Sequence, residues 1–159
     1  MWDLCSTDDY ITFSKAEELG LQGKDVVLTV EGIGSIEETT TTKIYDVPVF
    51  TRKGKKRIYQ CYGMETIASA AEPPEESSYR EMCSRFNVDM KEVERPRQID
   101  ILISMWHNQD HPKAVSSRGD MTLWDGAFGK ILGGAKVSNL MFSVVMSAPG
   151  RGDASTLLP

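Results

Sequence analysis

The segment from Lys24 to Met64 constrains the fold of this chain more than any other part of the sequence. It holds two runs rich in β-branched residues, KDVVLTVEG at 24–32 and SIEETTTTKIYDVPVF at 35–50, on either side of GIGS at 32–35. Val, Ile and Thr are enriched in strands, and glycine permits the positive φ of a tight turn. The pattern therefore predicts a long β-hairpin over residues 25–50 with a glycine tip.

A second turn extends this hairpin by another strand. TRKGKKR at 51–57 is a turn sequence, and RIYQCYGM at 57–64 alternates as a strand does when it pairs with the one before it. We interpret the basic cluster RKGKKR at 52–57 as a solvated hairpin tip, with a phosphate contact as the alternative.

Two short helices are also predicted. SKAEELGL at 14–21 begins with Ser14, which can cap the first turn, and Gly20 can close the helix in a left-handed conformation. The segment 78–86 is amphipathic because its apolar residues recur at helical spacing. These residues are Tyr79, Met82, Cys83 and Phe86. DMKEVE at 89–94 can add one more turn.

Beyond these helices the sequence returns to strand-forming residues. IDILISMW at 99–106 predicts a buried strand, and HNQDHPKAVSSRGD at 107–120 predicts a loop. MTLWDGAFGKILGG at 121–134 predicts two short strands around a tight turn at Asp125-Gly126. Many short strands separated by glycine turns indicate a mostly β chain, and we expect a closed, barrel-like antiparallel fold.

The size and composition of the chain fit a globular domain. Of its 159 residues, 40% are hydrophobic and 26% are charged. The net charge of −5 and the pI near 5.1 argue against nucleic-acid binding. The apolar-leaning stretch at 140–149 is too short to span a bilayer and no signal-peptide pattern is present, so we expect a cytoplasmic or intracellular location and no membrane contact. We expect a domain at 1–135 and a partly disordered C-terminal extension at 136–159.

The cysteine and histidine content predicts neither a disulfide framework nor a metal site. The cysteines are Cys5, Cys61 and Cys83. Their odd number and wide spacing favour a reducing compartment. His107 and His111 lie four residues apart, but Pro112 would end a helix there. We interpret both histidines as polar surface residues, with zinc binding as the alternative, and expect no metal and no cofactor.

An aspartate near the start of the sequence suggests a function. Asp3 lies in WDLCSTDDYIT at 2–12, where an apolar residue leads into a carboxylate, then small residues, then a hydrophobic run. A strand delivers a carboxylate to a tight turn in this way. The glycine-tipped hairpin follows further along the chain, and the later aliphatic strand ends in the small residue Ser104.

In this order and spacing, the chain resembles the retropepsin family of aspartic proteases, and more narrowly the protease-like region of BEL/Pao-type retroelement polyproteins. The resemblance covers roughly residues 1–135 and rests on three segments. They are WDLCST…GKDVVLTVEGIGS at 2–35, VERPRQIDILIS at 93–104 and MTLWDGAFGKILGG at 121–134.

The resemblance implies a homodimeric aspartic endopeptidase that cleaves a polyprotein or peptide segment. Each subunit would contribute Asp3 to a shared site on the two-fold axis. Two carboxylates about 3 Å apart cannot both ionise, so they share a proton. The ionised carboxylate activates water and the protonated one donates to the substrate carbonyl. Gly32, Ile33, Gly34 and Ser35 would form a flap that closes over an extended peptide.

The sequence departs from the family pattern in the catalytic turn. The family turn reads Asp, then Thr or Ser, then Gly, whereas this chain has Asp3, Leu4 and Cys5. Ser6 matches the small residue that follows in the family. Leu4 has no hydroxyl for the hydrogen bonds that tie the two loops together, and Cys5 adds a Cβ where the family has glycine.

The segments around this turn depart as well. The strand expected to support the turn consists of Ile101, Leu102, Ile103 and Ser104, and the serine stands where the family has glycine. Asp100 precedes this strand and needs a partner if it is buried, which Arg95 or Arg97 could supply. Only Met1 and Trp2 precede Asp3, so we expect a truncated N-terminal strand.

Other interpretations stay open. The domain could be a catalytically inactive member of the same fold that binds peptides or dimerises, or an unrelated β-barrel binding domain. Asp3 could be an exposed acid without a role, GIGS an ordinary turn, and Asp8 or Asp9 a turn cap or a hydrogen-bond partner near the loop. Cys5 could be a nucleophile, although no histidine lies near it in the sequence. We interpret RGD at 151–153 as a chance match.

Overall fold

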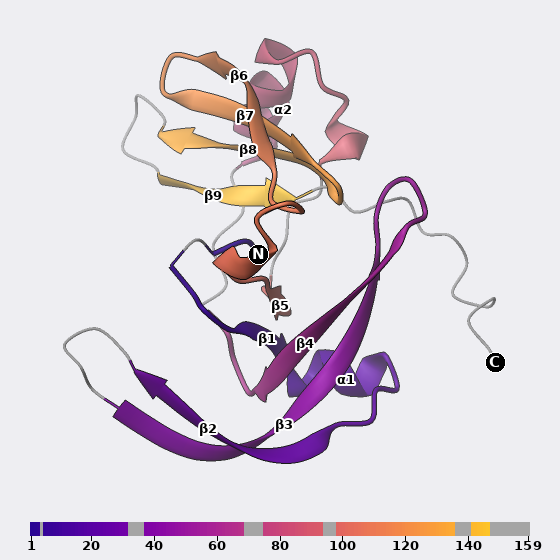
Figure 1. The fold of residues 1–159 in the computed structure, drawn as a ribbon. Coiled ribbons are helices and arrows are strands. Elements are labelled where there is room, and N and C mark those ends of the chain that lie inside the picture. The colour runs from indigo at the N-terminus through magenta and orange to yellow at the C-terminus, as the bar shows by residue number, and fades with distance from the viewer. Residues whose placement is uncertain (4, 32–36, 69–74, 94–97, 136–140, 147–159) are drawn as a thin grey trace. The chain divides into compact units, whose positions relative to one another are not determined.

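The structure is a computed structural model that describes residues 1–3, 5–31, 37–68, 75–93, 98–135 and 141–146 (Figure 1). It is mostly β, as the sequence predicts. The chain divides into two compact units, which are described separately below. Unit 1 comprises Met1–Val49, Lys56–Ser69 and Ile99–His107, and unit 2 comprises Phe50–Lys55, Ala70–Gln98 and Asn108–Pro159.

Unit 1 is built on a five-stranded sheet with the strand order β2-β3-β4-β1-β5. The strands are β1 Asp9–Thr12, β2 Lys24–Glu31, β3 Glu37–Phe50, β4 Lys56–Met64 and β5 Ile101–Leu102. β1 runs parallel to β4 and antiparallel to β5, so a strand from the start of the chain lies between two that come much later. This arrangement makes β1 an inner strand of the sheet, next to the edge strand β5.

The predicted long hairpin is present as β2 and β3 (Figure 1). Their antiparallel register runs from Lys24 paired with Ile44 to Glu31 paired with Glu37. β3 is also the neighbour of β4, which confirms the second predicted hairpin. Gly54 in the turn between them has a φ of 74°, which explains the glycine in this basic tip.

Helix α1 covers Phe13–Glu18, close to the predicted position. Its N-cap is Thr12, whose hydroxyl accepts a hydrogen bond from the Lys15 amide at 3.3 Å. The prediction that Ser14 caps the helix is therefore wrong; Thr12 takes that place because it is the last extended residue before the helix. Gly20 has a φ of 64°, as predicted for a residue that closes a helix.

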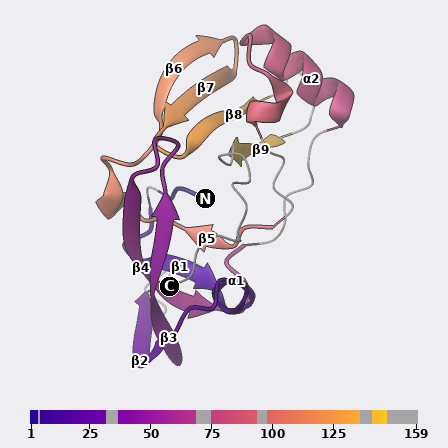
Figure 2. The ribbon, with the colours of Figure 1, turned by 90° about the vertical axis from the view of Figure 1, so that its right-hand side faces the viewer.

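Unit 2 contains a four-stranded antiparallel sheet with the order β6-β7-β8-β9 and the helices α2 and η1 (Figure 2). The strands are β6 Lys113–Arg118, β7 Met121–Gly126, β8 Gly129–Ala135 and β9 Met141–Met146. Helix α2 covers Glu76–Arg85, and the 3₁₀ helix η1 covers Met90–Glu92. The predicted C-terminal extension thus contributes β9, and its other residues lie outside the described part of the chain.

The buried core of unit 2 joins α2 to β7 and β8. It consists of Tyr79, Met82, Cys83, Phe86, Val88, Val93, Met121, Leu123 and Leu132. The four residues that define the predicted amphipathic helix are all in this core, so the helical spacing identified the buried face correctly. The Tyr79 hydroxyl donates a hydrogen bond to the Val93 carbonyl within the same core.

Three expectations for the second half of the chain are corrected by the structure. The segment predicted as a loop at 107–120 contains β6. The tight turn lies at 127–128 rather than at Asp125-Gly126, because Gly126 pairs with Gly129 at the end of the β7–β8 ladder. The predicted strand at 99–106 is shorter than expected, since β5 is followed by the 3₁₀ helix η2, Met105–His107.

The two sheets are open over the residues that the structure describes. Each has two edge strands, β2 and β5 in unit 1 and β6 and β9 in unit 2, with no ladder joining the edges. The closed barrel expected from the sequence is therefore not found, because β6 to β9 pair among themselves over the α2 core instead of completing the first sheet. No helix in the described ranges is long and apolar enough to cross a bilayer.

Candidate functional site

The N-terminal residues lie beside the segment that the sequence predicts to support the catalytic turn. Met1 N donates to Ile101 O at 2.6 Å, Ile103 N donates to Met1 O at 2.9 Å, and Asp3 N donates to Ile103 O at 3.0 Å. Trp2 and Ile103 form a parallel bridge. The structure therefore brings Asp3 together with the strand Ile101–Ser104, although the two are far apart in the sequence.

The Asp3 carboxylate is held by its own turn. Its Oδ1 accepts a hydrogen bond from the Cys5 amide at 2.9 Å, which makes a local turn closed by the aspartate side chain. Asp3 is partly exposed, and Cys5 is exposed. Leu4, the predicted middle residue of the turn, lies outside the described residues. The geometry orients one carboxylate oxygen and leaves the side chain accessible to solvent.

Ser6 links this turn to η2. Its hydroxyl donates to the Asp8 carbonyl at 2.7 Å, and its own carbonyl accepts the Met105 amide at 3.1 Å. Ser104, which precedes Met105, is only 1% exposed. The residues on both sides of Ser104 thus bond to the N-terminal segment, Ile103 to Asp3 and Met105 to Ser6.

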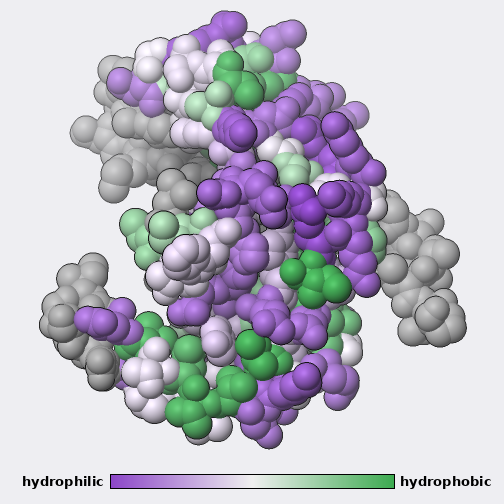
Figure 3. Space-filling model, viewed as in Figure 1, coloured by the Kyte–Doolittle hydropathy of each residue, from purple (hydrophilic) through white to green (hydrophobic). Residues whose placement is uncertain are grey.

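The predicted flap residues, Gly32, Ile33, Gly34 and Ser35, lie outside the described residues. The two strands that lead to the tip are described, and the hydroxyls of Thr29 and Thr39 lie 2.9 Å apart across them. β2 is an edge strand, and its Val27 is 70% exposed. Figure 3 shows apolar side chains over the part of unit 1 that holds β2 and β3. A strand edge with exposed apolar residues can pair with an extended peptide.

The most constrained polar group of unit 1 is Asp9, to which the sequence gave no catalytic role. Asp9 is 6% exposed, and both of its oxygens have donors. Oδ1 accepts the Ser104 amide at 2.6 Å, and Oδ2 lies 2.7 Å from Nε2 of His107. Because a carboxylate only accepts hydrogen bonds, Nε2 of His107 carries the proton in this contact.

The His107 ring is fixed by a second contact. It packs edge-on against the ring of Tyr59, with 4.7 Å between the centroids and an interplanar angle of 85°. The side chain is 30% exposed. His107 is thus a partner of a buried acid, whereas the sequence predicts a polar surface residue. The alternation along DYIT offered a clue, because Asp9 lies on the same strand face as the fully buried Ile11.

Asp100 bonds to Thr12 within the described part of the chain. Its Oδ1 accepts the Thr12 hydroxyl at 3.2 Å, and its carbonyl accepts the Thr12 amide at 2.9 Å. Arg95 and Arg97, the predicted partners, lie outside the described residues. The Thr12 side chain therefore serves both as the cap of α1 and as a donor to Asp100.

Cys61 lies next to Asp9 in the β1–β4 register and is fully buried. Burial and, to a smaller extent, the charge of Asp9 raise the pKa of the Cys61 thiol to about 12. The thiol therefore stays protonated at neutral pH and does not act as a nucleophile. Within the described ranges, no group of three His, Cys, Asp or Glu side chains is arranged to hold a metal ion.

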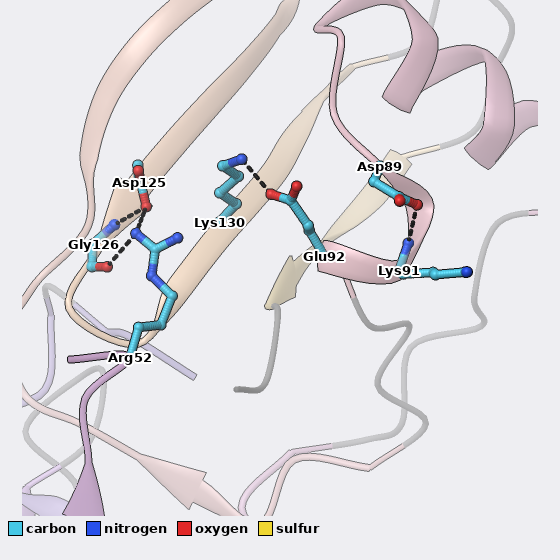
Figure 4. A network of polar contacts seen from close by, with 7 residues as sticks. All are labelled: Arg52, Asp89, Lys91, Glu92, Asp125, Gly126 and Lys130. Carbon is cyan, nitrogen blue, oxygen red and sulfur yellow. Dashed lines mark hydrogen bonds and ion pairs between the residues drawn. The ribbon is translucent and has the colours of Figure 1, made fainter. Parts of the chain in front are cut away.

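Unit 2 buries the polar residues Thr51 and Asp110, and it carries ion pairs at its surface (Figure 4). Arg52 Nη2 contacts Asp125 Oδ1 at 2.5 Å and the Gly126 carbonyl at 3.3 Å. Lys130 pairs with Glu92. Exposed ion pairs of this kind contribute little to stability, and the geometry of these two pairs points to no catalytic role.

Comparison of the chain with protein-family models, with curated proteins and with solved structures gives no match.

Proposed function

We propose that this chain is a retropepsin-like aspartic endopeptidase domain of a BEL/Pao-type retroelement polyprotein, acting inside the cell as a homodimer. The observation that carries the proposal is the backbone contact between Asp3 and Ile103, which sets the acidic turn directly on the strand expected to support it. The long β2–β3 hairpin supports it further, since a retropepsin-like site needs a flap in this part of the chain.

The chemistry requires two copies of Asp3, one from each subunit. Carboxylates that meet at the two-fold axis share one proton and titrate as a unit. One removes a proton from water and the other donates to the peptide carbonyl, so that the tetrahedral intermediate forms without a covalent enzyme adduct. The Cys5 amide, which donates to Asp3 Oδ1, orients the carboxylate for this task.

The substrate in this proposal is an extended peptide of a polyprotein. It would bind as an added strand through its main chain, with the tip of the β2–β3 hairpin closing over it. No cofactor and no metal enter the reaction, because the paired carboxylates supply both the acid and the base.

A second candidate function is an inactive module of the same fold that binds peptides or dimerises. The observation that favours it is the turn itself, in which Cys5 stands where the family has glycine and Leu4 where it has a hydroxyl residue. Edge strand β2 with its exposed Val27 would suit peptide binding without cleavage.

Cleavage of a peptide library at mildly acidic pH separates the two candidates. The wild type, the restored turn Leu4→Thr with Cys5→Gly, and the restored turn that also carries Asp3→Asn are compared, each with and without pepstatin. We expect pepstatin-sensitive cleavage that the restored turn raises and Asp3→Asn abolishes. If neither the native nor the restored protein cleaves any peptide but both dimerise, the module is supported. If neither cleaves nor dimerises, both candidates are rejected.

A further inference from the structure

The Asp9 carboxylate joins β1 to the segment that follows β5. Both hydrogen bonds that it accepts come from this one segment, one from the Ser104 amide and one from the His107 ring. A buried carboxylate is costly unless donors satisfy it, so both contacts are needed to offset the burial of Asp9. Together they fix residues 104–107 against β1 at two points.

His107 can keep this position because its ring is held from a second side. Tyr59 on β4 is 2% exposed and contacts the imidazole edge-on. β4 is in turn the parallel neighbour of β1. The ring of His107 is therefore located by two adjacent strands, and its Nε2 is directed at Asp9.

The segment held in this way is the one that contacts the turn of Asp3. Immediately before Ser104, the Ile103 carbonyl accepts the Asp3 amide, and immediately after it, the Met105 amide donates to Ser6. Any displacement of Ser104 would move both contacts. Hydrogen bonds and the backbone of residues 103–107 thus connect Asp9 and His107 to Asp3 and Ser6, at the two ends of the acidic turn.

We propose that Asp9 and His107 are positioning residues for the Asp3 turn: the pair sets the location of Ile103 and Met105, and through them the orientation of the Asp3 carboxylate. The consequence for catalysis rests on the proposed function, whereas the consequence for the turn does not. A pair that acted only on the stability of the fold would affect all of unit 1 alike when it is lost. The test must therefore measure the Asp3 turn separately from global unfolding.

Two variants of His107 separate positioning from packing. His107→Phe keeps an aromatic ring against Tyr59 but has no donor for Asp9, whereas His107→Gln offers an amide donor at a similar reach. Tyr79→Phe serves as the matched control, because it removes one buried hydrogen bond from the core of unit 2. All variants are made in the full chain.

The first readout is amide hydrogen exchange at Asp3, Ile103 and Met105. We expect His107→Phe to speed exchange at these amides by about tenfold, the effect of losing one buried hydrogen bond, and His107→Gln to restore most of the protection. Tyr79→Phe should leave them unchanged. Exchange that rises uniformly over β1 to β4, or does not rise at all at these three amides, would overturn the proposal.

The second readout covers amides that exchange too fast to measure. Cys5 is the exposed cysteine of the turn, whereas Cys61 and Cys83 are buried, so a trifluoromethyl tag on Cys5 reports on the turn by fluorine NMR. We expect a shifted or broadened signal in His107→Phe and recovery in His107→Gln. An identical signal in the wild type and both variants would contradict positioning.

Peptide cleavage distinguishes failure of this inference from failure of the proposed function. Where the wild type or the restored turn is active, His107→Phe should lower kcat about tenfold with little change in KM, since the carboxylate and not the peptide site is displaced. Where no form is active, the proposed function fails, and the exchange and fluorine readouts still decide whether the pair positions the turn. Equal loss in both His107 variants would leave packing as the only role and reject positioning.

Discussion

The core around α2 in unit 2 and the sheet of unit 1 differ in the side chains that they bury. The buried cluster around α2 consists of Tyr, Met, Cys, Phe, Val and Leu side chains from α2, β7, β8 and the segment around η1, whereas the buried polar residues of unit 2, Thr51 and Asp110, lie outside this cluster. The sheet of unit 1 also buries apolar residues, but Asp9, Thr12, Thr42 and Ser104 are buried among them. Each of the four takes part in a hydrogen bond, including Thr42, whose hydroxyl donates to the Gly63 carbonyl at 2.5 Å.

Apolar and polar burial have different consequences. Apolar burial stabilises in proportion to area and tolerates substitutions of similar volume. A buried polar group contributes little net stability, but it requires its partner at one position and orientation. Two of the buried polar groups of unit 1, Asp9 and Ser104, bond to each other at the segment that contacts Asp3, which is where a catalytic turn would need to be held in place.

The largest effect is expected in the apolar core of unit 2. Leu132→Ala should lower the free energy of unfolding of that unit by about 3 kcal/mol, because Leu132 is 1% exposed and its removal leaves a cavity. Leu132→Met, which conserves volume, should cost less than half as much. Amide exchange of α2 under denaturant measures the change. A loss below about 1 kcal/mol for the alanine variant would show that this core is not closely packed.

A smaller loss is expected from the polar core of unit 1. Asp9→Ala removes the acceptor of the bonds from the Ser104 amide and the His107 ring, which should cost about 2 kcal/mol. Asp8→Ala is the matched control, because the Asp8 carboxylate accepts a long hydrogen bond, 3.3 Å, from the exposed Thr7 hydroxyl, and its loss should change stability by less than about 0.5 kcal/mol. Amide exchange of β1 and β4 provides the measurement. Equal effects of the two variants would refute the importance of the buried pair.

The next effect depends on pH and concerns Cys61. Its pKa is raised from 9.0 to about 12 in the folded chain, so the folded state binds the thiol proton more tightly than the unfolded state does. The stabilisation is complete below pH 9 and is lost as the pH rises towards 12, at about 1.4 kcal/mol per pH unit. Wild type should therefore lose about 1.4 kcal/mol more stability than Cys61→Ala between pH 8 and pH 10. Parallel pH profiles of the two proteins would show that the thiol does not titrate as described.

The smallest effect is expected at the surface of unit 2. Arg52→Ala removes the pair with Asp125, and because both side chains are more than a third exposed, the loss should be within about 0.5 kcal/mol. Raising the salt concentration should reduce it further, which denaturant unfolding at two salt concentrations would detect. A loss above about 1 kcal/mol that does not change with salt would mean that the pair stabilises unit 2 more than a solvent-screened surface ion pair can.

The fold was predictable where local patterns are strong. The β-branched runs and glycines at 24–64 predicted β2, β3 and β4, and the helical spacing of Tyr79 and Phe86 predicted α2. β6 was not predicted, because KAVSSR is an edge strand whose residues are mostly exposed and show no apolar alternation. A sheet edge of this kind leaves no periodic pattern in the sequence.

The site was predictable only in part, for a related reason. The resemblance placed Asp3 next to the strand at 101–104, and the described contacts agree with that placement. The pair of Asp9 and His107 joins residues 98 positions apart, so no local spacing could indicate it. The inward face of β1 could have identified Asp9 as buried, but not its partner.

The distance between two Asp3 turns tests the central claim most directly. A nitroxide attached to Cys5, the exposed cysteine of the turn, reports this distance by pulsed electron spin resonance, because Cys61 and Cys83 are buried and stay unlabelled. The proposal predicts a homodimer with a strong dipolar coupling between the two labels, lost on dilution with unlabelled protein. A monomer, or a dimer whose labels show no coupling, would contradict a shared pair of Asp3 carboxylates.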